Sequence, residues 1–241
     1  MLLTYLNNPQ LKADFLAQIA EHEAADAFLK ATYGHTNGQF RGCAIGCSLH
    51  SLNVLQGKAD PTECTSNHER YPEELGLPIW LAHVEDTIFE MLPIAQAKTW
   101  PRRLSEAVPV GAVVDDLVWA KILRWSLADP QFGVRQATAD AKVRGYIDVV
   151  IAGFDAEIAG TATDAMRAKV GDAAWAARAG WDAYEAWAAW RAWYTMDARA
   201  AMDAWYTMDA RAARAWEARA GFYLALSEFV IATVRDLEPI A

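Results

Sequence analysis

The chain has 241 residues, of which 54% are hydrophobic and 22% are charged, and its 22 basic and 31 acidic residues give a formal net charge of −9. This composition is typical of a folded globular protein and differs from the polar, highly charged composition of disordered chains. The negative balance would repel phosphate backbones and anionic lipid headgroups, which argues against nucleic acid or a membrane as partner. The longest apolar stretches are also well short of the roughly 20 residues that cross a bilayer.

The termini and the cysteines indicate a cellular compartment. The first residues, MLLTYLNNPQ, contain no basic segment ahead of an apolar one, so they do not resemble a secretory signal. Three cysteines in a chain of this length do not make a disulfide framework. We therefore expect a cytoplasmic protein whose cysteines are free thiols or metal ligands.

Apolar spacing and breaker residues predict an all-α fold, with a compact helical domain over residues 1–160. Asn8 precedes Pro9 as an N-cap before the first helix, and Leu11, Phe15 and Ile19 then recur at four-residue spacing. Prolines and glycines delimit the other elements. In chain order the predicted helices are Pro9 to Gly34, Cys43 to Gln56, Pro78 to Pro93, a short helix from Pro101, Asp115 to Asp129, and Val134 to Ala159.

A second region, residues 161–241, differs sharply in composition. Residues 173–220 hold seven of the eleven tryptophans and contain no lysine or proline, and no helix breaker stands between Gly180 and Gly221. The sequence predicts a long Ala/Trp-rich helical region that packs back on the first domain or mediates homo-oligomers. Nine residues, WYTMDARAA, recur at 193–201 and 205–213, and a twelve-residue period rotates the second copy by about 120° on a helix. The copies cannot face one partner together, so a duplicated spacer is favoured over an aromatic binding surface.

All three cysteines and all five histidines precede residue 84, so any metal or thiol chemistry belongs to the N-terminal third. On a helix, the spacing of Cys43, Cys47 and His50 would place the three side chains on one face, and Cys64 with His68 repeats a four-residue spacing. Sulfur and imidazole are ligands that Zn²⁺ prefers, which makes zinc a candidate cofactor with five candidate ligands for four positions. The five are Cys43, Cys47, His50, Cys64 and His68.

Two alternatives compete with a zinc site. Cys43 follows a glycine at a predicted helix N-terminus, where the helix dipole lowers a thiol pKa, and His50 or His68 would then act as base. The simpler interpretation is that Cys43 and Cys47 are small core residues, with Gly42 and Gly46 allowing another helix to approach.

Acidic residues supply a further candidate site. His22 and Asp26 continue the apolar stripe of the first helix, as a general base or ligand with its carboxylate partner would. Asp86 and Glu90 lie four residues apart on the third clear helix, next to Glu85. Helical acid clusters bind Mg²⁺ when a second acidic pair faces them, and Glu23 with Asp26 is the pair that the sequence offers. A solvated helix face is the alternative.

Three segments, GCAIGCSLH, HERYPEELGLPIWLAHVEDTIFEMLP and WPRRLSEAVPVGA, resemble a group of uncharacterised hypothetical proteins of bacteriophages and prophages, which often end in Ala-, Arg- and Trp-rich repeats. The resemblance covers about residues 20–130. It implies a phage origin and carries over no fold, activity or residue role. By analogy, it favours interference with host defence, by occupying a host protein or sequestering a small nucleotide-like ligand.

The expected function is therefore that of a non-enzymatic cytosolic binding protein with a small molecule or a host protein as partner. The alternatives are a metal-dependent hydrolase, using the Cys/His set or Asp86 and Glu90, and a structural protein assembled through its tryptophan-rich region. The candidate ligand-binding residues are Cys43, Cys47, His50, His68, Tyr71, Glu74, His22 and Asp26.

Overall fold

A computed structural model describes residues 2–36, 38–137, 141–178 and 216–240. Over these ranges the chain forms helices and one pair of two-residue strands, which confirms the all-α prediction for the described part. Contacts group the chain into one unit of residues 1–114 with 223–241, and another of residues 115–222. The sequence predicts a boundary near residue 160, whereas this grouping assigns the C-terminal end of the last helix to the N-terminal unit.

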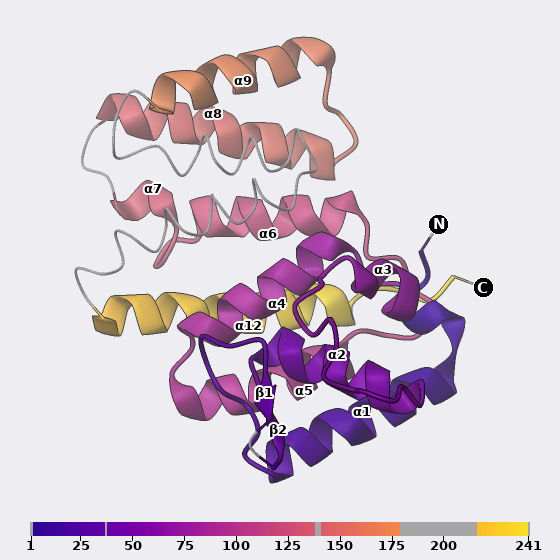
Figure 1. The fold of residues 1–241 in the computed structure, drawn as a ribbon. Helices are drawn as coiled ribbons and strands as arrows, with labels where there is room; N and C mark the ends of the chain where they lie inside the picture. The colour runs from indigo at the N-terminus through magenta and orange to yellow at the C-terminus, as the bar shows by residue number, and fades with distance from the viewer. Residues whose placement is uncertain (1, 37, 138–140, 179–215, 241) are drawn as a thin grey trace. The chain divides into compact units, whose positions relative to one another are not determined.

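The N-terminal unit is built on a short 3₁₀ turn, helices and a minimal hairpin (Figure 1). Helix α2 is its central element, since it contacts α1, α4 and α5 and is buried from Ala44 to Leu49. The elements of this unit are η1 Thr4–Asn7, α1 Pro9–Ala24, β1 His35–Thr36, β2 Phe40–Arg41, α2 Ala44–Leu55, α3 Arg70–Leu75, α4 Ile79–Met91, α5 Ile94–Ala107 and the end of α12 Trp216–Arg235.

Helix α1 starts where the sequence predicts and ends earlier. The Asn8 side chain accepts hydrogen bonds from the backbone N–H groups of Gln10 and Leu11, as an N-cap does. The helix ends at Ala24 and not at Gly34, because the chain turns at Asp26, whose φ is 51°. That turn buries Ala27 and Phe28 beneath the hairpin. Tertiary packing therefore overrides the local helical signal of this segment.

Gly46 explains how α2 can be so deeply enclosed. A Cβ atom built on Gly46 would lie 2.0 Å from the carbonyl oxygen of Tyr33, so only glycine admits the loop this close. The close approach that the sequence predicts for this glycine is confirmed, although the approaching element is a loop and not another helix.

Asn53 holds the long loop between α2 and α3 in place. Its buried side-chain amide donates to the carbonyl oxygens of Pro61 and Glu63, each at 2.8 Å, and its oxygen accepts from Arg70 at 2.7 Å. A loop without regular structure needs such partners for its backbone groups. The anchoring fixes residues 61–70, a stretch that includes His68.

The second unit contains α6 Asp116–Ala128, α7 Val134–Ala137, α8 Ala141–Ile158 and α9 Asp164–Arg178. Within it α8 contacts both α6 and α9 (Figure 1), and Asp115 caps α6 through the N–H groups of Leu117 and Val118. Most of the tryptophan-rich segment, including both copies of the nine-residue repeat, lies outside the described residues. None of the described helices combines the length and the apolar character that a bilayer crossing requires.

Candidate functional site

Three side chains of types that bind metal ions, Cys43, Asp86 and Glu90, converge where the start of α2 meets α4, and His68 lies beside Asp86; we name these four residues the Cys43 cluster. The Cys43 sulfur and one carboxylate oxygen from each of Asp86 and Glu90 all lie within 4.8 Å of one another. Asp86 and Glu90 are one turn apart on α4, so they share a face. Cys43 is the N-cap of α2, where its sulfur accepts the N–H of Gly46 at 3.4 Å.

His68 brings an imidazole nitrogen to the same carboxylate. Its Nε2 lies 3.7 Å from Oδ2 of Asp86, and its side chain is only 10% exposed. The other ring nitrogen, Nδ1, lies 3.1 Å from the carbonyl oxygen of Ser66, which can only accept a hydrogen bond. The ring of His83 stacks on that of His68 with the centroids 4.3 Å apart. These contacts fix the ring with Nε2 pointing at Asp86.

Two atoms of the cluster are buried without a hydrogen-bond partner among the described residues, namely Nε2 of His68 and Oδ1 of Asp86. Buried polar atoms are nearly always paired, and an orphaned one costs about 1–3 kcal/mol. Oδ2 of the same carboxylate lies 3.7 Å from Nε2 of His68 and accepts from the Tyr33 hydroxyl at 3.4 Å, so the remaining hydrogen-bonding capacity of the cluster lies in Oδ1 of Asp86 and Nε2 of His68.

Burial and charge act on the cluster in the same direction. Burial raises the pKa of the Cys43 thiol well above its usual range, and the nearby carboxylates of Asp86 and Glu90 raise it further. Burial also raises the pKa of Glu90, although the N–H of Ala31, within 3.1 Å of both carboxylate oxygens, opposes this. A metal-free cluster therefore holds its cysteine as a thiol, contrary to the lowered pKa that its place at a helix N-terminus predicts.

A buried acid lies behind the cluster. Glu85 is 4% exposed and accepts a hydrogen bond at 2.9 Å from the hydroxyl of Tyr71, which is itself buried. Burial raises the pKa of Glu85 to about 8, and the charge of Asp86 adds to that shift. Tyr71, predicted as a ligand-binding residue, thus serves as the partner of a carboxyl group that is neutral at pH 7.

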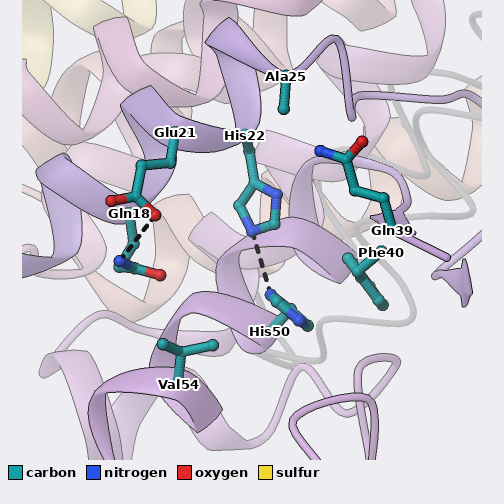
Figure 2. Close-up of a pocket in the computed structure, with 8 residues that line it drawn as sticks. All are labelled: Gln18, Glu21, His22, Ala25, Gln39, Phe40, His50 and Val54. Carbon is teal, nitrogen blue, oxygen red and sulfur yellow. Dashed lines mark hydrogen bonds between the residues drawn. The ribbon is translucent and has the colours of Figure 1, made fainter.

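A separate pocket of about 320 Å³ opens between α1, the hairpin and α2. Figure 2 shows His22 of α1 and His50 of α2 facing each other, with Phe40 of β2 beside His50. Nε2 of His22 lies 3.2 Å from Nδ1 of His50, and the Phe40 and His50 rings stack with centroids 4.1 Å apart. The lining residues are Gln18, Glu21, His22, Ala25, Gln39, Phe40, His50 and Val54.

Both histidines of this pocket are neutral at pH 7. Burial lowers the pKa of His22 to about 4, with a smaller contribution from His50, and burial alone lowers the pKa of His50. Glu21 is the one formally charged residue among those that line the pocket. The described residues there therefore offer neutral imidazoles and one carboxylate.

The five predicted zinc ligands do not converge on one point. The Cys47 thiol donates to the carbonyl oxygen of Gly42 at 3.5 Å, and burial raises its pKa to about 12. His50 pairs with His22, and Cys64 is exposed. The predicted common helical face fails because Cys43 is an extended N-cap residue with ψ of −178° and lies outside the helical register of α2.

Two further residues of the predicted ligand-binding set have surface partners. Asp26 follows the end of α1, is 60% exposed, and forms ion pairs with Lys98 and Arg41, so it does not continue the buried stripe. Glu74 pairs with Arg70 at 2.7 Å and accepts from Gln56 at 2.9 Å. These residues lie outside both the Cys43 cluster and the pocket.

The second acidic pair expected to face Asp86 and Glu90 is also absent from the described structure. Glu23, its predicted member, forms an ion pair with Arg102 at 2.6 Å. Cys43 and His68 lie near Asp86 in place of the predicted acidic pair. The candidate ligands therefore include a sulfur and a nitrogen as well as carboxylate oxygens. Comparison with protein-family models, with curated proteins and with solved structures finds no match for this chain.

Proposed function

We propose that this chain is a non-enzymatic binding protein whose N-terminal unit holds one divalent transition-metal ion, preferentially zinc, on the Cys43 cluster. The observation that carries the proposal is the orientation of His68. Since Nδ1 donates its proton to the carbonyl of Ser66, a neutral ring presents the bare lone pair of Nε2 to the carboxylate of Asp86. Two acceptors that face each other are paired either by a second proton on the ring or by a bound cation, and the sulfur and the second carboxylate close by favour the cation.

The spacing fits a metal ion. Zinc bonds nitrogen and oxygen at about 2.1 Å, so two such ligands at a tetrahedral angle are about 3.4 Å apart. The observed separation of 3.7 Å between Nε2 of His68 and Oδ2 of Asp86 differs from this by a few tenths of an ångström. A backbone carbonyl bonded to the other ring nitrogen, as that of Ser66 is here, commonly orients a metal-binding histidine.

The charges and the ligand types point to the same class of ion. An ionised Cys43 beside Asp86 and Glu90 would place three negative charges together at a site where Cys43 is buried and both carboxylates are partly buried, and a bound cation would offset their repulsion. Thiolate and imidazole favour zinc and related ions over Mg²⁺ or Ca²⁺, which prefer oxygen ligands. If His68 joins Cys43, Asp86 and Glu90 as a ligand, the four fill a tetrahedral site and leave no position for a reacting water, which favours binding over catalysis.

A test uses protein stripped with a chelator and titrated with Zn²⁺ and with Co²⁺. We expect one tight ion per chain, with a sulfur-to-cobalt charge-transfer absorption in the Co²⁺ form. Cys43→Ser should abolish that absorption and weaken Zn²⁺ binding by at least 100-fold, because it removes the only sulfur ligand. Cys64→Ser, at an exposed cysteine outside the cluster, is the matched control and should change neither. Equal zinc affinity in both variants would refute the proposal.

A metal-dependent hydrolase is the second candidate, and the position of Glu90 favours it. Both carboxylate oxygens of Glu90 lie within 3.1 Å of the N–H of Ala31. If Glu90 keeps this bond, an ion has three protein ligands and one open position, as catalytic zinc does. The Co²⁺ form distinguishes the two, because a closed tetrahedral site absorbs strongly in the visible range, whereas an added water that raises the coordination number weakens those bands.

The expectation of a small nucleotide-like ligand finds no support in the pocket, because its eight lining residues include no lysine or arginine to bind phosphate. Host-protein binding and assembly through the tryptophan-rich region stay predictions of the sequence. Both depend on residues beyond the described ranges or on partners of unknown chemistry.

A further inference from the structure

The pocket at His22 and His50 shares no residue with the Cys43 cluster, and its walls carry a second set of metal-binding groups. Nε2 of His22 and Nδ1 of His50 come from two different helices and meet at 3.2 Å. Two nitrogens bonded to one ion at about 2.05 Å and separated by that distance would subtend an angle of about 103° at the ion, close to tetrahedral. The pair is therefore already spaced as two ligands of one ion.

We propose that this pocket is a second, independent site for a divalent transition-metal ion, bound by the imidazoles of His22 and His50, with Glu21 on the same wall supplying negative charge and waters completing the coordination. Without an ion, the two rings share one N–H···N hydrogen bond. When an ion binds, the ring that donates this hydrogen bond moves its proton to its other nitrogen. Both facing nitrogens are then free to bind the ion, and each ring carries its proton on the nitrogen that points away. No net proton is lost, because both rings stay neutral.

Binding an ion requires the two rings to turn so that both lone pairs point at one position. The Phe40 ring lies nearly parallel to His50, with 14° between the planes, so His50 can turn in its own plane without losing the stacking contact. The His22 ring is tilted against Phe28 and T-shaped to Phe40, at centroid distances of 6.2 and 6.0 Å. These aromatic contacts keep both rings at the pocket.

The charge and volume of the pocket suit a hydrated cation. Glu21 is the only charged lining residue, so the net charge of the wall is −1, and Gln18 and Gln39 add amide oxygens. The Glu21 carboxylate accepts a hydrogen bond at 3.1 Å from Gln18, an exposed contact that leaves its negative charge on the pocket wall. A volume of about 320 Å³ has room for an ion with its remaining waters. Nitrogen and carboxylate ligands without sulfur favour Cu²⁺, Ni²⁺ and Zn²⁺.

The test uses Cu²⁺ as probe in the full chain carrying Cys43→Ser, which removes the sulfur ligand of the other site. We expect one Cu²⁺ per chain whose electron paramagnetic resonance spectrum shows coupling to two nitrogens. His22→Gln and His50→Gln should each weaken Cu²⁺ binding at least tenfold and remove one coupled nitrogen. His35→Gln, at an exposed histidine of the hairpin, is the matched control and should leave both unchanged.

Glu21→Gln supplies a variant that does not depend on the buried rings, and we expect it to weaken Cu²⁺ binding several-fold while circular dichroism stays unchanged. Equal affinity in the His22, His50 and His35 variants would show adventitious surface binding and overturn the proposal. This test is independent of the test of the proposed function. The pocket is judged by Cu²⁺ binding in the His22 and His50 variants, whereas the Cys43 cluster is judged by the cobalt–sulfur absorption in Cys43→Ser.

Discussion

Glu85 should make the stability of the metal-free protein fall as the pH rises above neutrality. In the folded chain, burial raises the pKa of Glu85 to about 8 from its ordinary value of 4.5. Between these values the folded protein holds a proton that the unfolded chain has released, so raising the pH favours unfolding. The stabilisation of the protonated form is complete below pH 4.5 and is lost as the pH passes through about 8.

The magnitude follows from the shift. Each pH unit between the two pKa values changes the free energy of unfolding by about 1.36 kcal/mol, so the whole range of 3.5 units is worth about 5 kcal/mol. Between pH 6.5 and pH 8 the expected loss is about 2 kcal/mol. His22, with its pKa lowered to about 4, has the opposite effect, but mostly below pH 6.5.

Glu85→Gln isolates this contribution. Glutamine has the shape of a protonated glutamate, keeps an oxygen that can accept the hydrogen bond of Tyr71, and does not titrate. In urea titrations with a chelator present, the stability of the variant relative to the parent should rise by about 2 kcal/mol between pH 6.5 and pH 8. All other titrating groups are common to both proteins and cancel. Parallel pH profiles would refute the reasoning, because they would mean that Glu85 is already ionised in the folded chain.

Four further substitutions test the packing, the anchoring of the site and the pH dependence. Gly46→Ala should cost about 2–3 kcal/mol in urea unfolding, because its Cβ would overlap a backbone carbonyl, whereas Gly145→Ala, with nothing within 4 Å on exposed helix, should stabilise its unit by about 0.5–1 kcal/mol. Asn53→Ala should destabilise the fold by about 2–3 kcal/mol and weaken Zn²⁺ binding in calorimetry, since it frees the loop that carries His68. Tyr71→Phe removes a hydrogen bond that lowers the pKa of Glu85, so the fall of stability with pH should continue to higher pH than in the parent. The packing account is contradicted if Gly145→Ala lowers stability, and the anchoring account if Asn53→Ala leaves the zinc affinity unchanged. The Glu85 account is contradicted if stability in Tyr71→Phe stops falling at a lower pH than in the parent.

Local chemistry made several element boundaries predictable. Capping residues and prolines set helix ends through contacts within a few residues of themselves. The structure accordingly has α1 beginning after Asn8, α6 beginning after Asp115, and α4 ending just before Pro93. The end of α1 was not predictable, because the chain leaves the helix through a left-handed turn at Asp26 to bury two hydrophobic side chains. That choice depends on a core that the local sequence does not contain.

The candidate site shows the same division. The sequence names Cys43 and His68 in one set and Asp86 with Glu90 in another, and both sets lie in the N-terminal third. Their convergence requires α2 to pack against α4 and a loop to return to α4, which are contacts between distant parts of the chain. The separation of Cys47 from Cys43 was foreseeable in one respect. Cys43 caps α2, and a capping residue does not share the helical register of residues such as Cys47 that follow it.

X-ray absorption at the zinc edge, on protein loaded with one equivalent of Zn²⁺, tests the Cys43 cluster most directly. The account predicts one sulfur ligand at about 2.3 Å and three nitrogen or oxygen ligands at about 2.0–2.2 Å, with the sulfur lost in Cys43→Ser. A first shell without sulfur, or one with two sulfurs, would contradict it.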